Sequence, residues 1–164
     1  MMNDQLQASH VVCTSEFFLR LRAWSGRREA VRAVALVGSV ARGDARPDSD
    51  VDVVLLVLDL ACYLEHTNWV SDMDLVERVS TESYGKVTSL RVRYAGGPEV
   101  EFAIASNDWA TAPVDSGTEE VARQGILVLL DRDGEVTALA ATTARRNVSC
   151  ESTATGTSAK WQQR

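Results

Sequence analysis

Two aspartates separated by a single residue are the side chains of this sequence best suited to chemistry. Asp50 and Asp52 lie at the start of an apolar, largely β-branched run over residues 51–58, which predicts a buried strand. Because side chains alternate along a strand, both carboxylates point to one face, with Cα atoms roughly 6–7 Å apart. Mg²⁺ prefers such oxygen ligands and would offset the repulsion between two buried acids. The pair therefore predicts a magnesium site.

A glycine-serine pair precedes these aspartates. Gly38 and Ser39 end a short apolar run over residues 34–37, which predicts a first strand, and the ten turn-rich residues 40–49 separate Ser39 from Asp50. A small residue after a strand, where a helix starts, lets backbone N–H groups approach a phosphate, and the serine hydroxyl adds a donor. An anion site would then lie beside a cation site, as phosphoryl and nucleotidyl transfer require.

A third acid, Glu101, lies in a later predicted strand. Residues 87–94 and 100–105 both alternate between apolar and polar or small side chains, and the glycine-glycine-proline sequence at 96–98 separates them. This pattern predicts an antiparallel hairpin. Glu101 could complete a two-metal site or accept the proton of an attacking hydroxyl.

The register of this hairpin follows from keeping both apolar sets on the core face. A three-residue loop over residues 96–98 places Tyr94 opposite Val100 and Arg93 opposite Glu101. Arg93 could then hold the Glu101 carboxylate or contact a phosphate.

The remaining patterns supply the elements that position these residues. Ser116 and Glu119 resemble a capping box that opens a helix ending near Gly125. Further predicted elements are an amphipathic helix over 14–24, one or two short helices over 63–73, a strand over 126–130 and a helix over 136–145. The expected fold class is α+β, with a central mixed sheet of about four to five strands and flanking helices.

The length and composition limit the classes of protein to which the chain could belong. The 164 residues suit one domain, expected over residues 1–146, followed by a Ser/Thr/Ala-rich tail over 147–164 that we expect to be disordered. A net charge of −6 argues against nonspecific nucleic-acid binding. Three cysteines without a metal or redox spacing, and no apolar run long enough for a bilayer, predict a cytoplasmic protein without a membrane partner.

The stretch GSVARGDARPDSDVDVVLL, from Gly38 onward, resembles the signature of the DNA polymerase β-like nucleotidyltransferase superfamily. Within it, the stretch is similar to the minimal bacterial group that includes antitoxin-type and aminoglycoside nucleotidyltransferases. The resemblance implies two Mg²⁺ ions and a nucleoside triphosphate donor, for which we expect ATP. It also implies roles for particular residues: Gly38 and Ser39 would hold the β- and γ-phosphates, and Asp50, Asp52 and Glu101 the metals. Arg42 could contact the triphosphate.

The sequence therefore predicts an enzyme that moves a nucleoside monophosphate, expected to be AMP, from a nucleoside triphosphate to an acceptor hydroxyl. The acceptor is open between a small molecule, such as an aminoglycoside-like compound, and a protein, such as a toxin partner that becomes AMPylated. A non-catalytic nucleotide-binding or interaction module on the same fold is the alternative from another class. At this length a homodimer or a partner protein could complete the acceptor pocket.

Overall fold

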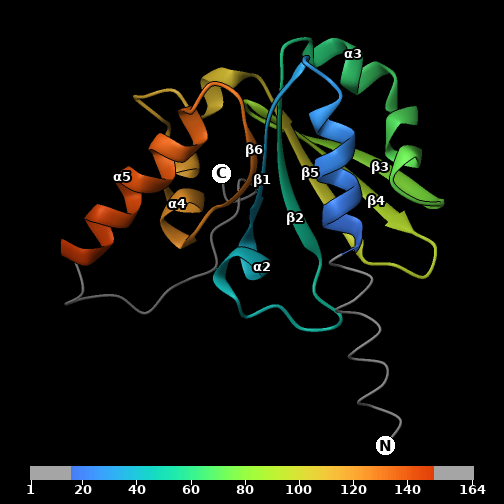
Figure 1. Cartoon of the computed structure of the whole chain (residues 1–164), viewed down its shortest axis with the longest axis horizontal. Coiled ribbons are helices and arrows are strands. Elements are labelled where there is room, and N and C mark those ends of the chain that lie inside the picture. The colour runs from blue at the N-terminus through green and yellow to red at the C-terminus, as the bar shows by residue number, and fades with distance from the viewer. Residues whose placement is uncertain (1–15, 150–164) are drawn as a thin grey trace, which may run out of the picture.

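The computed structural model of the chain describes residues 16–149 and contains one six-stranded sheet with helices on both faces (Figure 1). The strand order is β3-β4-β5-β2-β1-β6, and β2 and β5 are the parallel neighbours in an otherwise antiparallel sheet. The predicted α+β class is confirmed. The strands are β1 (Val31–Val37), β2 (Val51–Val57), β3 (Val76–Tyr84), β4 (Val87–Tyr94), β5 (Glu99–Ala105) and β6 (Leu127–Asp131).

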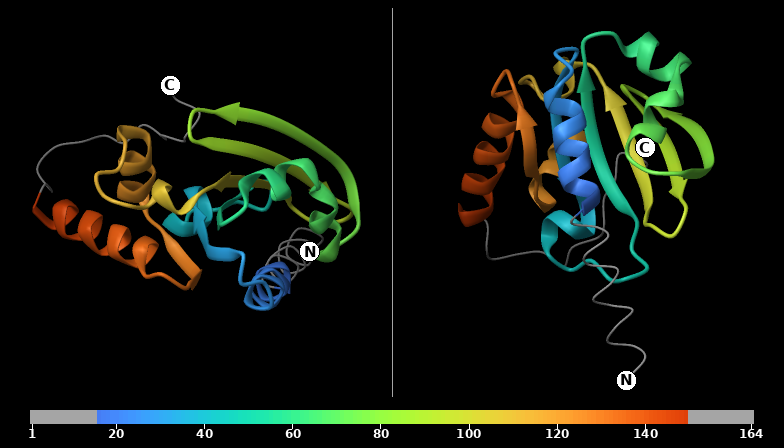
Figure 2. Two further views of the ribbon diagram at one scale, coloured as in Figure 1. Left: turned by 90° about the horizontal axis from the view of Figure 1, so that it is seen from above. Right: turned by 45° about the vertical axis from the view of Figure 1, so that its right-hand side comes forward.

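Helices pack on both faces of the sheet (Figure 2). A helical segment over residues 16–26 packs on one face with α3 (Leu60–Glu65) and the 3₁₀ helix η1 (Thr67–Asp72). The other face carries the 3₁₀ helix η2 (Asn107–Trp109) and the helices α4 (Ser116–Gln124) and α5 (Glu135–Ser149). The short helix α2 (Gly38–Arg42) follows β1 directly, at the end of the sheet where β2 begins (Figure 1).

Burial on both faces explains the sequence of the central strands. All seven residues of β2 are buried, because helices pack on either side of it, and all of them except Asp52 are apolar instead of alternating. The segment 16–26 buries Phe17, Leu21 and Trp24, which recur at helical spacing. Trp24 stacks on Trp69 with ring centroids 5.2 Å apart, so η1 is held against this helix.

One strand was not predicted. β3 carries the sequence VERVSTESY, and most of its residues are exposed because it is an edge strand that extends to the side of the sheet away from α5 (Figure 2). An edge strand without a buried face has no apolar alternation, so residues 76–84 give no strand signal. The sheet has six strands for this reason, instead of the four to five expected.

The predicted register of the hairpin is wrong by two residues. Val92, not Tyr94, lies opposite Val100, and Arg91, not Arg93, lies opposite Glu101. A shift of two residues keeps every side chain on its face, so the apolar pattern cannot distinguish the two registers. The connection between the strands decides it, and β4 and β5 are joined by four residues, 95–98, instead of three.

Two helix ends also differ from expectation. The cap of α4 is Asp115, whose Oδ1 accepts a 2.7 Å hydrogen bond from the Thr118 backbone N–H, in place of the predicted Ser116. α5 continues to Ser149, which places residues 147–149 of the expected tail in a helix. The rest of that tail, residues 150–164, lies outside the described residues. Within residues 16–149, no helix is long and apolar enough to cross a membrane.

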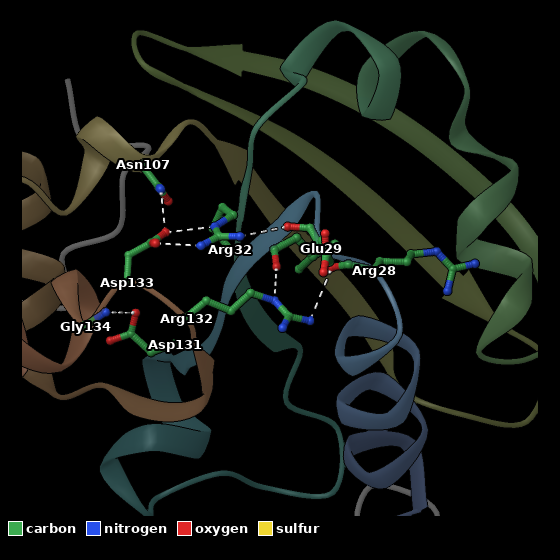
Figure 3. Close-up of polar contacts among 9 residues, drawn as sticks. Arg28, Glu29, Arg32, Asn107, Asp131, Arg132, Asp133 and Gly134 are labelled. Carbon is green, nitrogen blue, oxygen red and sulfur yellow. Dashed lines mark hydrogen bonds and ion pairs between the residues drawn. The ribbon is translucent and has the colours of Figure 1, made fainter.

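Charged side chains tie β6 to the start of β1, at the end of the sheet away from α2 (Figure 3). Arg132 donates hydrogen bonds to the backbone carbonyls of Val31, at 2.9 Å, and Ser25, at 3.1 Å. Asp133 accepts bonds from Arg32, at 2.9 and 2.6 Å, and from the side-chain amide of Asn107, at 2.9 Å. These bonds lower the pKa of Asp133 from 3.8 to about 2.

This lowered pKa makes a testable contribution to acid stability. Asp133 is more acidic in the folded chain than in the unfolded one, so its ion pair stabilises the fold fully above pH 3.8, and the contribution disappears as the pH falls towards 2. We expect Asp133→Asn to lower the melting temperature at pH 7 and the difference from the wild type to close between pH 4 and 2. Asp48→Asn, in an exposed loop, is the control. A difference that persists unchanged at pH 2 would contradict the assignment.

Candidate active site

The glycine-serine bend, which Gly38 and Ser39 form after β1, lies beside Asp52 at one end of the sheet. Val37, the last residue of β1, is the antiparallel partner of Asp52, so the chain leaves β1 at Gly38 directly beside that carboxylate. Gly38 has φ 68°, in the left-handed region, and a Cβ on it would overlap Oδ2 of Asp52. Both the backbone conformation and the lack of space therefore require glycine here.

The parallel pairing of β2 with β5 brings a second acid to the same place. Asp52 and Glu101 are register partners on neighbouring strands and share one face of the sheet. Their exposed fractions are 3% and 1%. Adjacent strands are about 4.8 Å apart, so two buried carboxylates lie side by side.

Polar residues of β4 hold Glu101. The Ser89 hydroxyl donates to its Oε1 at 2.6 Å, and Arg91 Nη2 donates to its Oε2 at 3.3 Å. Arg91 takes the position predicted for Arg93, because of the register shift. The roles of Ser89 and Arg91 were missed, although both lie on the polar side of a strand whose alternation was recognised.

Asp50 lies immediately before β2 and is half-buried. In the described part of the chain, no three His, Cys, Asp or Glu side chains are grouped so that they could hold a metal ion. Asp50, Asp52 and Glu101 thus do not form a three-carboxylate cluster. Asp52 and Glu101 by themselves fit a divalent cation, since two buried oxygen-donor groups lie on one face of adjacent strands.

Two further candidate nucleotide-binding residues at this end of the sheet, Ser39 and Arg42, lie in α2. Ser39 occupies its first turn, half-buried, beside Gly38. Arg42 donates to the Asp44 carboxylate at 3.3 Å and to the Gln124 side-chain oxygen at 3.0 Å. Arg42 thus links α2 to the end of α4.

The same face continues beyond Glu101 as a polar groove over β4 and β3, with a volume of about 280 Å³. The described residues that line it include no large apolar side chain and are Arg78, Ser80, Glu82, Arg91, Arg93 and Glu99. Arg93 therefore faces this groove, and its neighbour on β5 is Glu99.

Residues 20–92 match the family described as "Nucleotidyltransferase domain". This part of the chain, which is less than half of it, is similar to nucleotidyltransferase domains of the DNA polymerase β-like type. Proteins of this family typically use a nucleoside triphosphate and a divalent metal ion. The match includes Gly38, Ser39, Asp50 and Asp52 and ends before Glu101.

Solved structures with a similar fold include an aminoglycoside 6-adenyltransferase from Bacillus subtilis, at 15% identity and TM-score 0.45 over 58% of this chain and 35% of that one. The non-canonical poly(A) polymerase complex GLD-2–GLD-3 matches at 15% identity and TM-score 0.43, over 86% of this chain and 40% of that one. The GLD-2/RNP-8 complex matches at 16% identity and TM-score 0.41, over 86% and 38%. The chain thus spans at most two fifths of these structures. No curated protein matches.

The contact between Gly38 and Asp52 can be tested against a second glycine. Gly38→Ala places a methyl group against the Asp52 carboxylate and adds about 1–2 kcal/mol of backbone strain. Gly43→Ala is the matched control, because Gly43 has φ 77° but open space around a Cβ. We expect Gly38→Ala to lower the free energy of unfolding, measured in urea, more than Gly43→Ala does. The excess should shrink in an Asp52→Ala background, and equal losses in all three cases would contradict the contact.

Proposed function

We propose that this protein is a Mg²⁺-dependent nucleotidyltransferase that moves AMP from ATP to an acceptor hydroxyl. One observation carries the proposal: in a chain that matches the nucleotidyltransferase domain family, the glycine that follows β1 lies against Asp52, and Asp52 lies beside Glu101. A polyphosphate at the bend and a cation at the acids would then be adjacent, which is the arrangement that the transfer needs.

The bend is the proposed site for the outer phosphates of the donor. Gly38 has no side chain to block the backbone, and Ser39 offers a hydroxyl beside it, so both can approach phosphate oxygens. Arg42 lies one helical turn further on and is the nearest guanidinium along the chain. Its bonds to Asp44 and Gln124 are with exposed groups, so a triphosphate could take their place.

Asp52 is paired with Glu101, and this acid pair is the proposed metal site. Asp52 and Glu101 would hold Mg²⁺, and Asp50, two residues before Asp52 on the same side, would join them by a side-chain rotation. When bound, one or two such ions neutralise the charge of the phosphates and lower the pKa of the attacking hydroxyl. Ser89 and Arg91 orient the Glu101 carboxylate through its two oxygens.

In the proposed reaction the acceptor oxygen forms a bond to the α-phosphorus, and the bond from that phosphorus to the bridging oxygen of the β-phosphate breaks. Pyrophosphate leaves, and the hydroxyl proton passes to Glu101. The residues contribute mainly by positioning the two substrates and by balancing charge. A small molecule and a protein both remain candidate acceptors.

The acids are tested by removing their charge. We expect Asp50→Asn combined with Asp52→Asn, and separately Glu101→Gln, to reduce nucleotidyl transfer by about a hundredfold or more, because each charge neutralised removes a ligand for the cation. The assay is the transfer of label from [α-³²P]ATP to any component of a cell extract, with and without EDTA and added Mg²⁺. Asp48→Asn, in the exposed loop before Asp50, should keep its activity.

Transfer that survives the double aspartate change would contradict the mechanism. Binding of Mg²⁺ and ATP in calorimetry, without pyrophosphate release or label transfer to any extract, would identify a non-catalytic nucleotide-binding module instead.

A further inference from the structure

Two arginines lie opposite each other on β3 and β4, the two outermost strands at one edge of the sheet. Arg78 of β3 and Arg93 of β4 are direct register partners, and both line the 280 Å³ groove. Within residues 16–149, neither side chain makes a hydrogen bond or an ion pair of its own. Like charges directly opposite each other on neighbouring strands destabilise a sheet, and an anion held between them would remove that cost.

The two acidic side chains of the groove, Glu82 and Glu99, contact residues other than its two facing arginines. Glu99 is the strand partner of Arg93, but its Oε1 lies 3.8 Å from Arg91 Nε. Arg91 also bonds to Glu101, and the Glu82 carboxylate accepts a hydrogen bond from the Tyr84 hydroxyl. Among the described residues, the two guanidinium groups of the groove therefore have no counter-ions of their own. Paired guanidinium groups match the oxygens of a phosphate, which they can bind in a bidentate manner.

The groove lies next to the acid pair on the side away from the glycine bend. A single transverse row of register partners runs from Asp52 to Glu101 and Arg91, and then to Ser80. At about 4.8 Å per strand, the Cα atom of Arg91 is roughly 10 Å from that of Asp52. Gly38 is on the opposite flank of Asp52, after β1. A donor at the bend would leave this groove to the second substrate.

From this arrangement we infer that the groove binds the phosphate group of a small acceptor, such as a phosphorylated sugar or polyol, and directs its hydroxyl to the acid pair. The inference rests on the proposed nucleotidyl transfer and adds the chemical class of the acceptor. A volume of about 280 Å³ suits one small molecule. The net charge of −6 disfavours a polynucleotide, which needs an extended basic surface.

The anion site is tested without nucleotide. Inorganic phosphate is titrated into the full chain and its binding is followed by ³¹P NMR. We expect Arg78→Gln combined with Arg93→Gln to weaken phosphate binding at least about tenfold, since each lost guanidinium removes charge-assisted hydrogen bonds. The control is Arg20→Gln combined with Arg123→Gln, which removes the same charge from exposed arginines outside the groove. Equal affinity in the groove variant and the wild type, or equal loss in the control, overturns the site.

The acceptor class is tested by transfer. Small-molecule extract is treated with alkaline phosphatase, which is then removed, and label transfer from [α-³²P]ATP is compared with untreated extract. We expect the treatment to abolish the labelled product, and the groove double variant to raise the KM for the extract at least about tenfold while its affinity for ATP with Mg²⁺ stays unchanged. A product that survives phosphatase, or that nuclease treatment of the extract removes, overturns the inference.

The two proposals fail in different ways. Transfer to an acceptor that lacks phosphate would leave the nucleotidyltransferase function standing and overturn the acceptor class. Absence of transfer to every extract would overturn both the function and the acceptor class. Loss of phosphate binding in the groove variant would then still identify an anion site.

Discussion

The register between β2 and β5 is the constraint on which the whole site depends. It is the parallel pairing of the sheet, and it aligns Asp52 with Glu101 on one face. A slip of one residue would turn one of the acids into the apolar core on the other face and replace it with a valine or a phenylalanine. The fully buried apolar side chains of β2 and β5 on the opposite face hold this register, so the packing of the core and the geometry of the site are specified together.

Two acids buried in this sheet require favourable contacts or space, and different neighbouring residues provide these for each acid. Glu101 is almost fully buried, and a buried carboxylate is costly unless it is hydrogen-bonded or paired. Ser89 and Arg91 supply those bonds from the next strand. On the other flank, Asp52 lies so close to the end of β1 that only glycine fits at position 38. Each acid therefore has a neighbouring strand adapted to it.

The face of the sheet that carries the acids is divided in two. Over β6, β1 and the carboxyl ends of β2 and β5, small and apolar side chains pack under α4 and α5. Over β4 and β3 the same face is polar and forms the arginine-lined groove. The acid pair lies at the border. The apolar half anchors the site in the fold, and the polar half remains open to a ligand beside it, which is where the proposed acceptor would bind.

The sequence by itself determined the apolar central strands and the position of Gly38, Ser39, Asp50 and Asp52 in a strand–turn–strand unit. It also predicted an amphipathic helix over residues 14–24, and the described residues have it over 16–26. These features are local, because periodicity and turn chemistry are written in neighbouring residues. It also placed Glu101 on the polar side of its strand. The pairing of residues across strands could not be predicted in this way, since a register shift of two residues leaves every local pattern intact.

Only the tertiary structure decided that Arg91 and Ser89 bond to Glu101, and that Arg93 faces Glu99 and Arg78. It also revealed β3, an exposed edge strand whose polar sequence carries no signal of its own and which forms only because β4 offers unpaired backbone groups. The chemistry of single residues could be predicted from the chain. Which of them meet is a property of long-range pairing, and the groove beside the acids exists only through that pairing.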